Sequence, residues 1–183
     1  MIRRIISFFL LICLSPLFLI VALTIILEDG FPIFFRQRRI GVKNDKFWIY
    51  KFRTMKKYTP DIPTHLVKEA QNINTFIGPT LRKLSIDELP QLINIIKGEM
   101  VFIGPRPALY NQKDLIDLRT KAGVHILTPG VTGWAQVNGR DDLPIPQKVE
   151  LDEYYLKHKS FFLNIKILFM TAFQIIFPKG VSH

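Results

Sequence analysis

The hydrophobic residues of this chain form one long uncharged run, several short aromatic segments and two stripes at helical spacing. The uncharged run covers residues 5–27. As a helix rising about 1.5 Å per residue, it is long enough to cross a hydrocarbon core about 30 Å thick. We therefore predict a membrane segment. A secretory signal peptide is the alternative, but the run is long for one and no small-residue cleavage site follows it.

Ser15 and Pro16 interrupt the middle of this run. Proline removes a backbone donor and clashes with the preceding turn, while Ser15 can bond back to a freed carbonyl, so we expect a kink. Arg3 and Arg4 precede the run, and nine basic residues against three acids follow it in residues 28–57. Because basic flanks favour the cytoplasm, a helix that breaks here and returns to the same leaflet is favoured. A kinked spanning helix that exports only its N-terminal arginines is the alternative.

The segments after the membrane run are short and aromatic. Residues 32–35 and 47–53 have strand-forming side chains, and the basic stretch 38–45 separates them. This pattern predicts a small β-hairpin whose turn lies in the basic stretch. A loop over residues 56–64 and a short helix from residue 64 to about residue 76 are expected next.

Two further apolar patterns predict helices in the second half of the chain. Four residues lie on one face of a helix that ends near Gly98, and they are Leu89, Leu92, Ile93 and Ile96. Residues 161–177 are apolar except for Asn164, Lys166, Thr171 and Gln174. This segment is a poor membrane span and is predicted to be a helix lying in the membrane interface, with a buried core helix as the alternative.

Composition supports contact with lipid and with an anionic partner. Hydrophobic residues make up 48% of the chain and the mean hydropathy is +0.18, while 25 Lys and Arg against 15 Asp and Glu give a net charge of +10. The anionic partner could be a nucleic acid, an anionic leaflet or a nucleotide-activated substrate. The single cysteine, Cys13, excludes an internal disulfide and a cysteine zinc cluster.

The adjacent acids Asp87 and Glu88 are the leading candidates for chemistry. Two neighbouring carboxylates in a basic chain can hold a divalent cation and attack an electrophilic phosphorus. The alternative is a capping box with Ser85 as N-cap and Glu88 at the third helical position. Pro90 makes a regular first turn less certain, because it removes one helical hydrogen bond. In either register Asp87 lies at a helix N-terminus, which also favours phosphate.

Two downstream segments are candidate phosphate or nucleotide contacts. Arg106 lies between two prolines in residues 104–107, which restrains the backbone and suits an arginine that presents its fork to phosphate; a rigid surface turn is the alternative. Residues 128–140 form a glycine-punctuated loop and strand that ends in Arg140, without the dinucleotide fingerprint or P-loop spacing. Residues 148–157 are predicted to be helical and include Asp152, for which an ordinary solvated face is the alternative.

These motifs together resemble one family, the bacterial sugar transferases, also called monotopic polyprenyl-phosphate phosphoglycosyl transferases. The resemblance covers nearly the whole chain. Because several specific motifs occur in one order, it is strong evidence for a catalytic role of the acid pair. The motifs are Ser15-Pro16, Lys51-Phe52-Arg53-Thr54-Met55, residues 82–92, Gly104-Pro105-Arg106-Pro107 and residues 129–140.

The resemblance implies an α+β, mostly helical monotopic membrane protein in a minimal catalytic-domain form. Residues 1–28 would be a re-entrant membrane helix broken at Ser15-Pro16. Residues 29–183 would be a catalytic domain on the cytoplasmic face of the bacterial inner membrane, with the small β-hairpin and an interfacial C-terminal helix. The two parts would act as a single functional unit.

The resemblance also implies a reaction. A sugar 1-phosphate would pass from a UDP-sugar to undecaprenyl phosphate with release of UMP, as the first membrane step of polysaccharide or glycoprotein glycan assembly. Downstream glycosyltransferases would be further partners, and nucleic acid would not be one. The aspartate matching Asp87 attacks the sugar-proximal phosphorus, and the glutamate matching Glu88 helps bind Mg²⁺, with Asp87 as the other metal-site acid.

Arg106 and Arg140 are the candidates for phosphate contacts. The additional substrate-binding candidates are Lys51, Arg53, Arg82 and Asp152. One departure from the family pattern is Asn164, at a position where an aspartate often precedes residues 165–168, so an ionic role there is in doubt. Two other classes stay open: a membrane glycosyltransferase that releases UDP, and a basic module that binds anionic lipid or nucleic acid.

Overall fold

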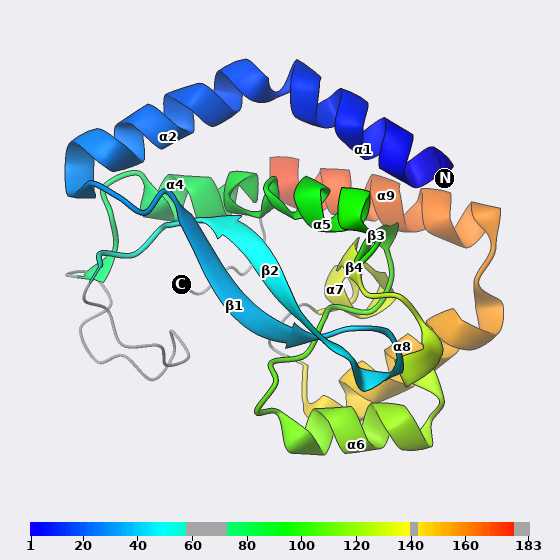
Figure 1. Ribbon diagram of the computed structural model, residues 1–183. Coiled ribbons are helices and arrows are strands. Elements are labelled where there is room, and N and C mark those ends of the chain that lie inside the picture. The colour runs from blue at the N-terminus through cyan, green and yellow to red at the C-terminus, as the bar shows by residue number, and fades with distance from the viewer. Residues whose placement is uncertain (58–72, 140–142, 178–183) are drawn as a thin grey trace.

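A bent arch of two apolar helices lies over the rest of the molecule in the computed structural model (Figure 1). The structure describes residues 1–57, 73–139 and 143–177. The arch consists of α1 (Ile2–Cys13) and α2 (Ser15–Asp29). The helices meet at a 60° bend. The Ser15 hydroxyl donates a hydrogen bond to the Ile12 carbonyl at 2.7 Å, and Pro16 lies in the first turn of α2. The predicted kink at Ser15-Pro16 is therefore confirmed.

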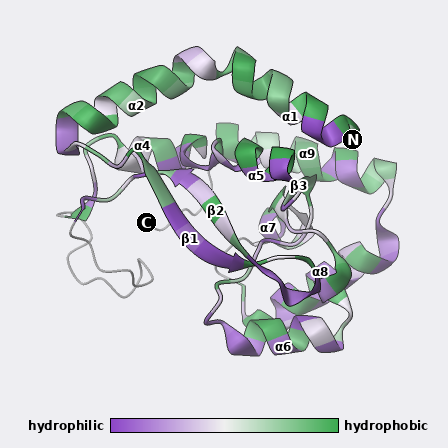
Figure 2. Cartoon of the chain, viewed as in Figure 1, coloured by the Kyte–Doolittle hydropathy of each residue, from purple (hydrophilic) through white to green (hydrophobic). Residues whose placement is uncertain are grey.

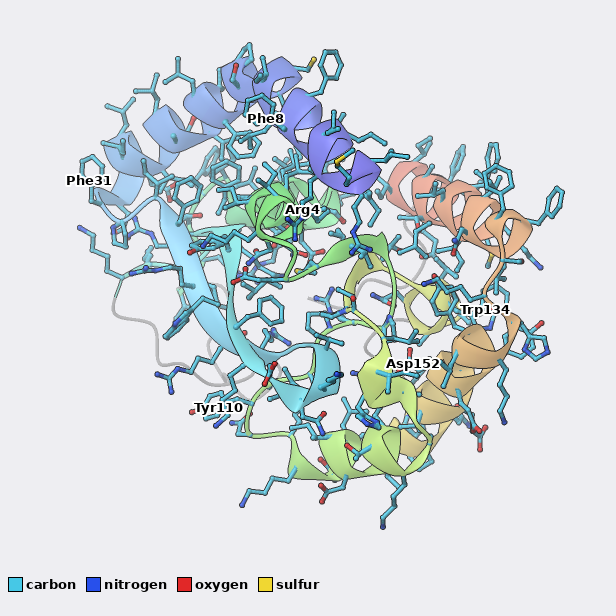
Figure 3. All side chains as sticks on the ribbon, turned by 45° about the vertical axis from the view of Figure 1, so that its right-hand side comes forward. Arg4, Phe8, Phe31, Tyr110, Trp134 and Asp152 are labelled. Carbon is cyan, nitrogen blue, oxygen red and sulfur yellow. The ribbon has the colours of Figure 1, made fainter. Side chains whose placement is uncertain are left out.

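Both ends of the arch are attached to the same globular body. Near the N-terminus the Arg4 guanidinium reaches α5 (Gln91–Lys97), so close to Gly98 that an added Cβ would lie 2.2 Å from Nη2 (Figure 3). At the other end Arg53 donates to the carbonyls of Asp29 and Gly30 at 3.1 and 2.8 Å and pairs with the Asp29 carboxylate at 3.1 Å. Within the described ranges no single helix is long and apolar enough to cross a membrane, whereas the bent pair together satisfies that test.

The predicted β-hairpin is confirmed, and its turn lies within the predicted stretch 38–45 but is shorter than predicted. Strands β1 (Phe34–Ile40) and β2 (Lys46–Phe52) pair in antiparallel register, and the turn occupies residues 41–45, where η1 (Val42–Asn44) forms a short 3₁₀ helix. Arg38 and Arg39 belong to β1. The Arg38 guanidinium lies over the Trp48 ring at 5.1 Å, and Arg39 donates to the Pro107 carbonyl at 3.1 Å. Because these contacts accommodate both arginines within the strand, their charge did not mark a turn.

Below the arch lies a layer of short helices that carries the acid pair: α4 (Gly78–Lys83), η3 (Ile86–Glu88) and α5 (Figure 1). The helix predicted to end near Gly98 is confirmed, but the predicted apolar face is wrong in part. Asn94 faces inward and holds the hairpin, because its amide donates to the Trp48 carbonyl at 2.7 Å and accepts from the Tyr50 amide at 3.1 Å. The buried positions of α5 are therefore Gln91, Leu92, Asn94 and Ile95.

The second half of the chain builds the opposite side of the molecule. Parallel strands β3 (Val101–Ile103) and β4 (Gly130–Thr132) form a small second sheet. The same half of the chain contains α6 (Lys113–Lys121), η4 (Val124–Ile126), α7 (Trp134–Val137) and α8 (Ile145–His158). The helix predicted over residues 148–157 is confirmed within α8. The helix predicted over residues 64–76 lies largely outside the described residues.

Helix α9 (Phe161–Ile176) buries Ile167 in the core, and most of its polar side chains make contacts with the rest of the protein. Asn164 accepts a hydrogen bond from the Tyr155 hydroxyl, and Lys166 lies over the Trp134 ring. Thr171 pairs with Thr132, and Gln174 donates to the Val137 carbonyl. The exposed side chains are Phe161, Phe162, Leu168, Phe169, Phe173 and Ile176.

A buried core helix would not leave so many large apolar side chains exposed, so that alternative is wrong. Figure 2 shows hydrophobic residues along α9 and along both helices of the arch. In Figures 1 and 3 the arch and α9 lie on the same side of the molecule, opposite α6. The mixed, mostly helical fold with a small sheet component agrees with the expected α+β class, and its exposed apolar elements share one side.

The attachment at Arg53 generates a stability prediction. Replacing Arg53 by methionine should lower the free energy of unfolding by about 2 kcal/mol, because the two carbonyls at the end of α2 lose the Arg53 donor and the Asp29 carboxylate loses its ion-pair partner. Thermal unfolding in detergent micelles measures this. Arg36→Met, an exposed arginine of β1, is the matched control and should change stability by less than about 0.5 kcal/mol. Equal effects of the two substitutions would contradict the conclusion that Arg53 anchors the end of α2.

Candidate active site

The acid pair lies in an irregular turn between α4 and α5, where Ser85 has a positive φ of 55° and leads into the 3₁₀ turn η3. The Ser85 side chain makes no capping hydrogen bond to this turn. The capping-box explanation of the acids is therefore wrong. The turn directs Asp87 inward, where only 7% of the residue is exposed. A buried carboxylate that caps nothing is a stronger candidate for chemistry than a helix cap.

Two cations from distant elements converge on Glu88. Lys51 Nζ, from β2, lies 2.6 Å from Glu88 Oε1 and 3.8 Å from Asp87 Oδ2. Arg106 Nη2, from the loop after β3, lies 3.2 Å from the same Glu88 oxygen. Glu88 is therefore held from two sides, while Asp87 next to it has only the longer contact with Lys51 among the ion pairs of the described residues.

A third cation, Arg82, completes the surroundings of the acid pair. Its Nε donates to the Thr54 hydroxyl at 2.9 Å, which orients the guanidinium between α4 and the end of β2. Burial lowers the pKa of Arg82, and the Asp87 charge partly opposes that effect. An arginine keeps its charge at any physiological pH, so Arg82 adds to the positive potential around Asp87.

The two carboxyl groups differ in ease of ionisation. Burial raises the pKa of Asp87, partly offset by Lys51, and the neighbouring Glu88 charge raises it further. Burial alone would raise the pKa of Glu88 as well, but the charges and hydrogen bonds of Lys51 and Arg106 hold it well below its usual range. Glu88 therefore stays ionised, whereas Asp87 is a less stabilised and more reactive carboxylate.

The structure brings some of the predicted site residues together and gives others different partners. Lys51, Arg82 and Arg106 surround the acid pair. Arg53 is bound to the end of α2, and Asp152 is buried in an ion pair with Arg119, its Oδ2 2.6 Å from Nη2. Asp152 is 1% exposed, so a solvated helix face does not describe it. Arg140 lies outside the described residues.

Three contacts of this region were not predicted from the sequence. Thr54 orients Arg82, Arg119 binds the backbone of Arg106 at 2.8 Å, and Arg39 binds the Pro107 carbonyl. Thr54 lies within the motif that begins at Lys51, so that motif could have suggested it. Arg119 and Arg39 lie in other elements, and only the folded chain brings them to this turn.

The departure at Asn164 has a simple structural reading. Its side-chain oxygen accepts a hydrogen bond of 2.8 Å from Tyr155, a residue that is 2% exposed. An amide oxygen accepts this bond as a carboxylate oxygen does, without bringing a charge into a partly buried position. The substitution therefore preserves this contact between α8 and α9.

The donor set around the acids fits a magnesium ion only in part. Among the described residues, no group of three or more histidine, cysteine or acidic side chains could hold a metal. Mg²⁺ does not require such a group, because it is commonly held by one or two carboxylates together with substrate phosphates and water. Asp87 and Glu88 fit that mode, and a cation would relieve the burial that disfavours the charged form of Asp87.

The fold and site define a protein with an apolar side and, directly below it, a cation-flanked acid pair suited to phosphate chemistry. The family model described as bacterial sugar transferase matches residues 1–178. The chain therefore belongs to the bacterial sugar transferase family, and the resemblance inferred from its motifs is confirmed. Its assignment as a sugar transferase is confirmed at the level of that family.

Three relatives show the range of the match. The chain is 41% identical to the uncharacterized sugar transferase EpsL of Bacillus subtilis, over 97% of this chain and 86% of EpsL. It is 39% identical to an undecaprenyl-phosphate glucose phosphotransferase of Komagataeibacter xylinus, over 95% of this chain and 35% of that protein. It is 40% identical to a UDP-N-acetylgalactosamine-undecaprenyl-phosphate N-acetylgalactosaminephosphotransferase of Aeromonas hydrophila, over 88% of this chain and 40% of that protein. The chain thus spans well under half the length of the latter two.

The cations around Asp87 generate a pH prediction. Activity that needs ionised Asp87 should fall as the pH drops through its pKa, which burial places above the ordinary value of 3.8. Lys51→Met removes the cation that most opposes this effect, so the acidic limb of the rate profile should move to higher pH. The profile of sugar transfer between about pH 4 and 9 measures the shift.

The matched control for this prediction is Lys121→Met, which removes an exposed lysine at the end of α6. Its acidic limb should coincide with that of the unmodified protein. A limb that stays in place or moves to lower pH in Lys51→Met would show that Asp87 ionisation does not govern the rate.

Proposed function

We propose that this protein transfers a sugar 1-phosphate from a UDP-sugar to undecaprenyl phosphate and releases UMP, with Asp87 as the nucleophile. Relatives whose names state sugar phosphotransfer to undecaprenyl phosphate support the general reaction. The assignment of Asp87 as the nucleophile rests on its position. It is a buried carboxylate that caps no helix, and the neighbouring Glu88 is already bound by Lys51 and Arg106.

The first step forms a bond between an Asp87 carboxylate oxygen and the phosphorus that carries the sugar. The bond from that phosphorus to the bridging oxygen of UMP breaks, and UMP leaves with the electron pair. In the second step an oxygen of undecaprenyl phosphate attacks the same phosphorus, and the bond to Asp87 breaks. The product is undecaprenyl diphospho-sugar, and the aspartate returns to its carboxylate form.

The cations of the site are suited to a substrate that carries several negative charges. Lys51, Arg82 and Arg106 surround the acid pair, and their charges stabilise the diphosphate of the donor and the charge on departing UMP. Arg106 is 32% exposed, so part of its fork is accessible to a phosphate. A Mg²⁺ ion held by Asp87 and Glu88 would supply further charge neutralisation at the phosphates.

Asp87 lies on the apolar side of the molecule, where a lipid phosphate would arrive. Ile86, its neighbour, packs against the core cluster that contains Val21 and Ile25 of α2. The outward apolar face of α9 and the exposed residues of the arch lie on that same side. This arrangement supports membrane association with the catalytic turn just below the lipid surface.

We further propose that the arch is re-entrant and that the catalytic domain lies on the cytoplasmic face of the inner membrane. Arg4 contacts α5 at one end of the arch and Arg53 binds Asp29 at the other, so both ends rest on one body. A span would place these ends on opposite faces of a bilayer. The basic residues on both flanks agree with a cytoplasmic location.

The product of this reaction is a lipid-linked sugar, which places the enzyme at the first membrane step of a glycan pathway. Glycosyltransferases that extend a lipid-linked sugar would act next, and membrane lipid is the remaining expected partner. A UDP-releasing glycosyltransferase is the alternative enzyme. A basic lipid- or nucleic-acid-binding module would not require a buried acid pair, and none of the observations favours it.

The nucleotide product tests this proposal. The purified protein with Mg²⁺, undecaprenyl phosphate and a panel of UDP-sugars should release UMP from at least one donor. Asp87→Asn should reduce turnover by at least about 1,000-fold, because an amide is a poor nucleophile. Asp117→Asn, the same change at an exposed aspartate of α6, is the matched control and should retain activity.

Release of UDP would establish ordinary glycosyl transfer instead. Full activity of Asp87→Asn would exclude the covalent step. Retention of a radiolabelled sugar phosphate on the denatured protein in the absence of undecaprenyl phosphate, and its loss in Asp87→Asn, would detect the intermediate directly.

The topology of the arch has its own test. A cysteine introduced by Ile2→Cys in a Cys13→Ser background should react with a membrane-impermeant thiol reagent only after the inner membrane is opened, because both ends of the arch face the cytoplasm. Lys121→Cys on exposed α6 is the control for the catalytic domain and should behave in the same way. Labelling of residue 2 from the periplasm in intact spheroplasts would show a spanning helix.

A further inference from the structure

The turn formed by residues 105–107 presents the arginine that contacts Glu88, and its two prolines have no backbone N–H to anchor it. Arg106 extends from this turn to within 3.2 Å of Glu88 Oε1, while both flanking prolines are buried. The place of the guanidinium in the site therefore depends on what holds the carbonyl groups of the turn.

All three carbonyl groups of this turn accept hydrogen bonds. The Gly130 amide donates to the first, the carbonyl of Pro105, at 2.9 Å. Arg119 Nη1 donates to the second, the carbonyl of Arg106 itself, at 2.8 Å. Arg39 Nη1 donates to the third at 3.1 Å. Two of the three anchors are thus arginine side chains from other elements, and the middle one binds the backbone of the arginine at the site.

Arg119 is held in turn by a buried partner. Its Nε and Nη2 both donate to Asp152 Oδ2, at 2.9 and 2.6 Å, and the two side chains are 9% and 1% exposed. Figure 3 shows Asp152 on the inner side of α8. The planar guanidinium therefore has one edge on Asp152 and its remaining nitrogen, Nη1, on the turn. Charge-assisted bonds at low exposure give this arrangement strength and a defined direction.

The turn borders a small unfilled space on the side that faces Arg119. A cavity of about 30 Å³ lies behind it, lined by residues that include Arg106, Arg119 and His125. This volume is sufficient for one water molecule or two, so side chains do not fill the space against which the turn would otherwise rest. The hydrogen bond from Arg119 therefore restrains a turn that is incompletely packed.

We propose that Arg119, oriented by Asp152, is a positioning residue that sets the place of Arg106 in the active site. This proposal rests on the proposed function, and it gives Asp152 an indirect role in place of the substrate contact predicted from its sequence context. Among the described residues, neither Arg119 nor Asp152 forms a hydrogen bond or ion pair with Asp87 or Glu88. Their effect on the reaction should pass through the Arg106 backbone.

The test is a double-mutant cycle in which the ion pair is replaced as a unit. Arg119→Met together with Asp152→Leu removes the bond to the Arg106 carbonyl and leaves no unpaired buried charge, a replacement that proteins commonly tolerate in folding. The matched control is Glu153→Gln with Lys157→Met, which removes a solvent-facing pair of the same helix, with side chains 35% and 62% exposed. Each pair is made in the unmodified protein and in Arg106→Ala.

The expected result is a fall in kcat/KM of roughly 10- to 100-fold for the buried pair in the otherwise unmodified protein. In the Arg106→Ala background the same replacement should change kcat/KM by less than about 2-fold, because the group it positions is already absent. The surface pair should have little effect in either background. Arg119→Lys, which keeps the charge but not the fork, should show the same dependence on Arg106.

A purely structural role gives a different pattern. The buried pair would then lower kcat/KM by the same factor with and without Arg106, in proportion to the loss of folded protein in thermal unfolding, and this result would overturn the proposal. If the buried-pair variant does not fold, Arg119→Lys decides by the same criterion. Absence of UMP release from the unmodified protein would overturn the proposed function itself. Equal effects of the buried-pair replacement with and without Arg106 would overturn only the positioning role of Arg119.

Discussion

One carboxylate oxygen, Glu88 Oε1, joins the three parts of the active site. It accepts Lys51 from the hairpin and Arg106 from the turn after β3, at 2.6 and 3.2 Å. The side chains of Lys51 and Glu88 are about 16% and 15% exposed, so water screens this interaction less than it would at the surface. Because Lys51 and Arg106 both bind Glu88, the ionised form of neighbouring Asp87 is the less stabilised of the two.

The same design principle extends outward from this pair. Asn94 joins α5 to the backbone of β2, Arg53 joins β2 to the end of the arch, and Arg119 joins α6 and α8 to the turn at Arg106. Each is a polar side chain that links elements through backbone groups in the interior. Most of the exposed large apolar residues lie on the arch and α9, so one outer side of the molecule is rich in apolar side chains.

Local patterns predicted several elements because their causes are local. Pro16 breaks the arch through its missing N–H group, and α9 follows from its apolar residues and their polar interruptions. The errors arose where long-range partners override local preference. Arg38 and Arg39 remain in a strand because they contact Trp48 and Pro107, and Asn94 is buried because β2 and Glu99 supply hydrogen-bonding partners for its side chain.

The sequence by itself determined the family, the acid pair and the break in the apolar run, because each of these is encoded by residues that are adjacent in the chain. Only the tertiary structure separated the basic and acidic candidates, placing Lys51, Arg82 and Arg106 around the acids while assigning Arg53 to the arch and Asp152 to Arg119. The physical reason is that ion pairs and hydrogen bonds depend on distances of a few ångströms between side chains that lie tens of residues apart. No local pattern specifies those distances before the chain folds.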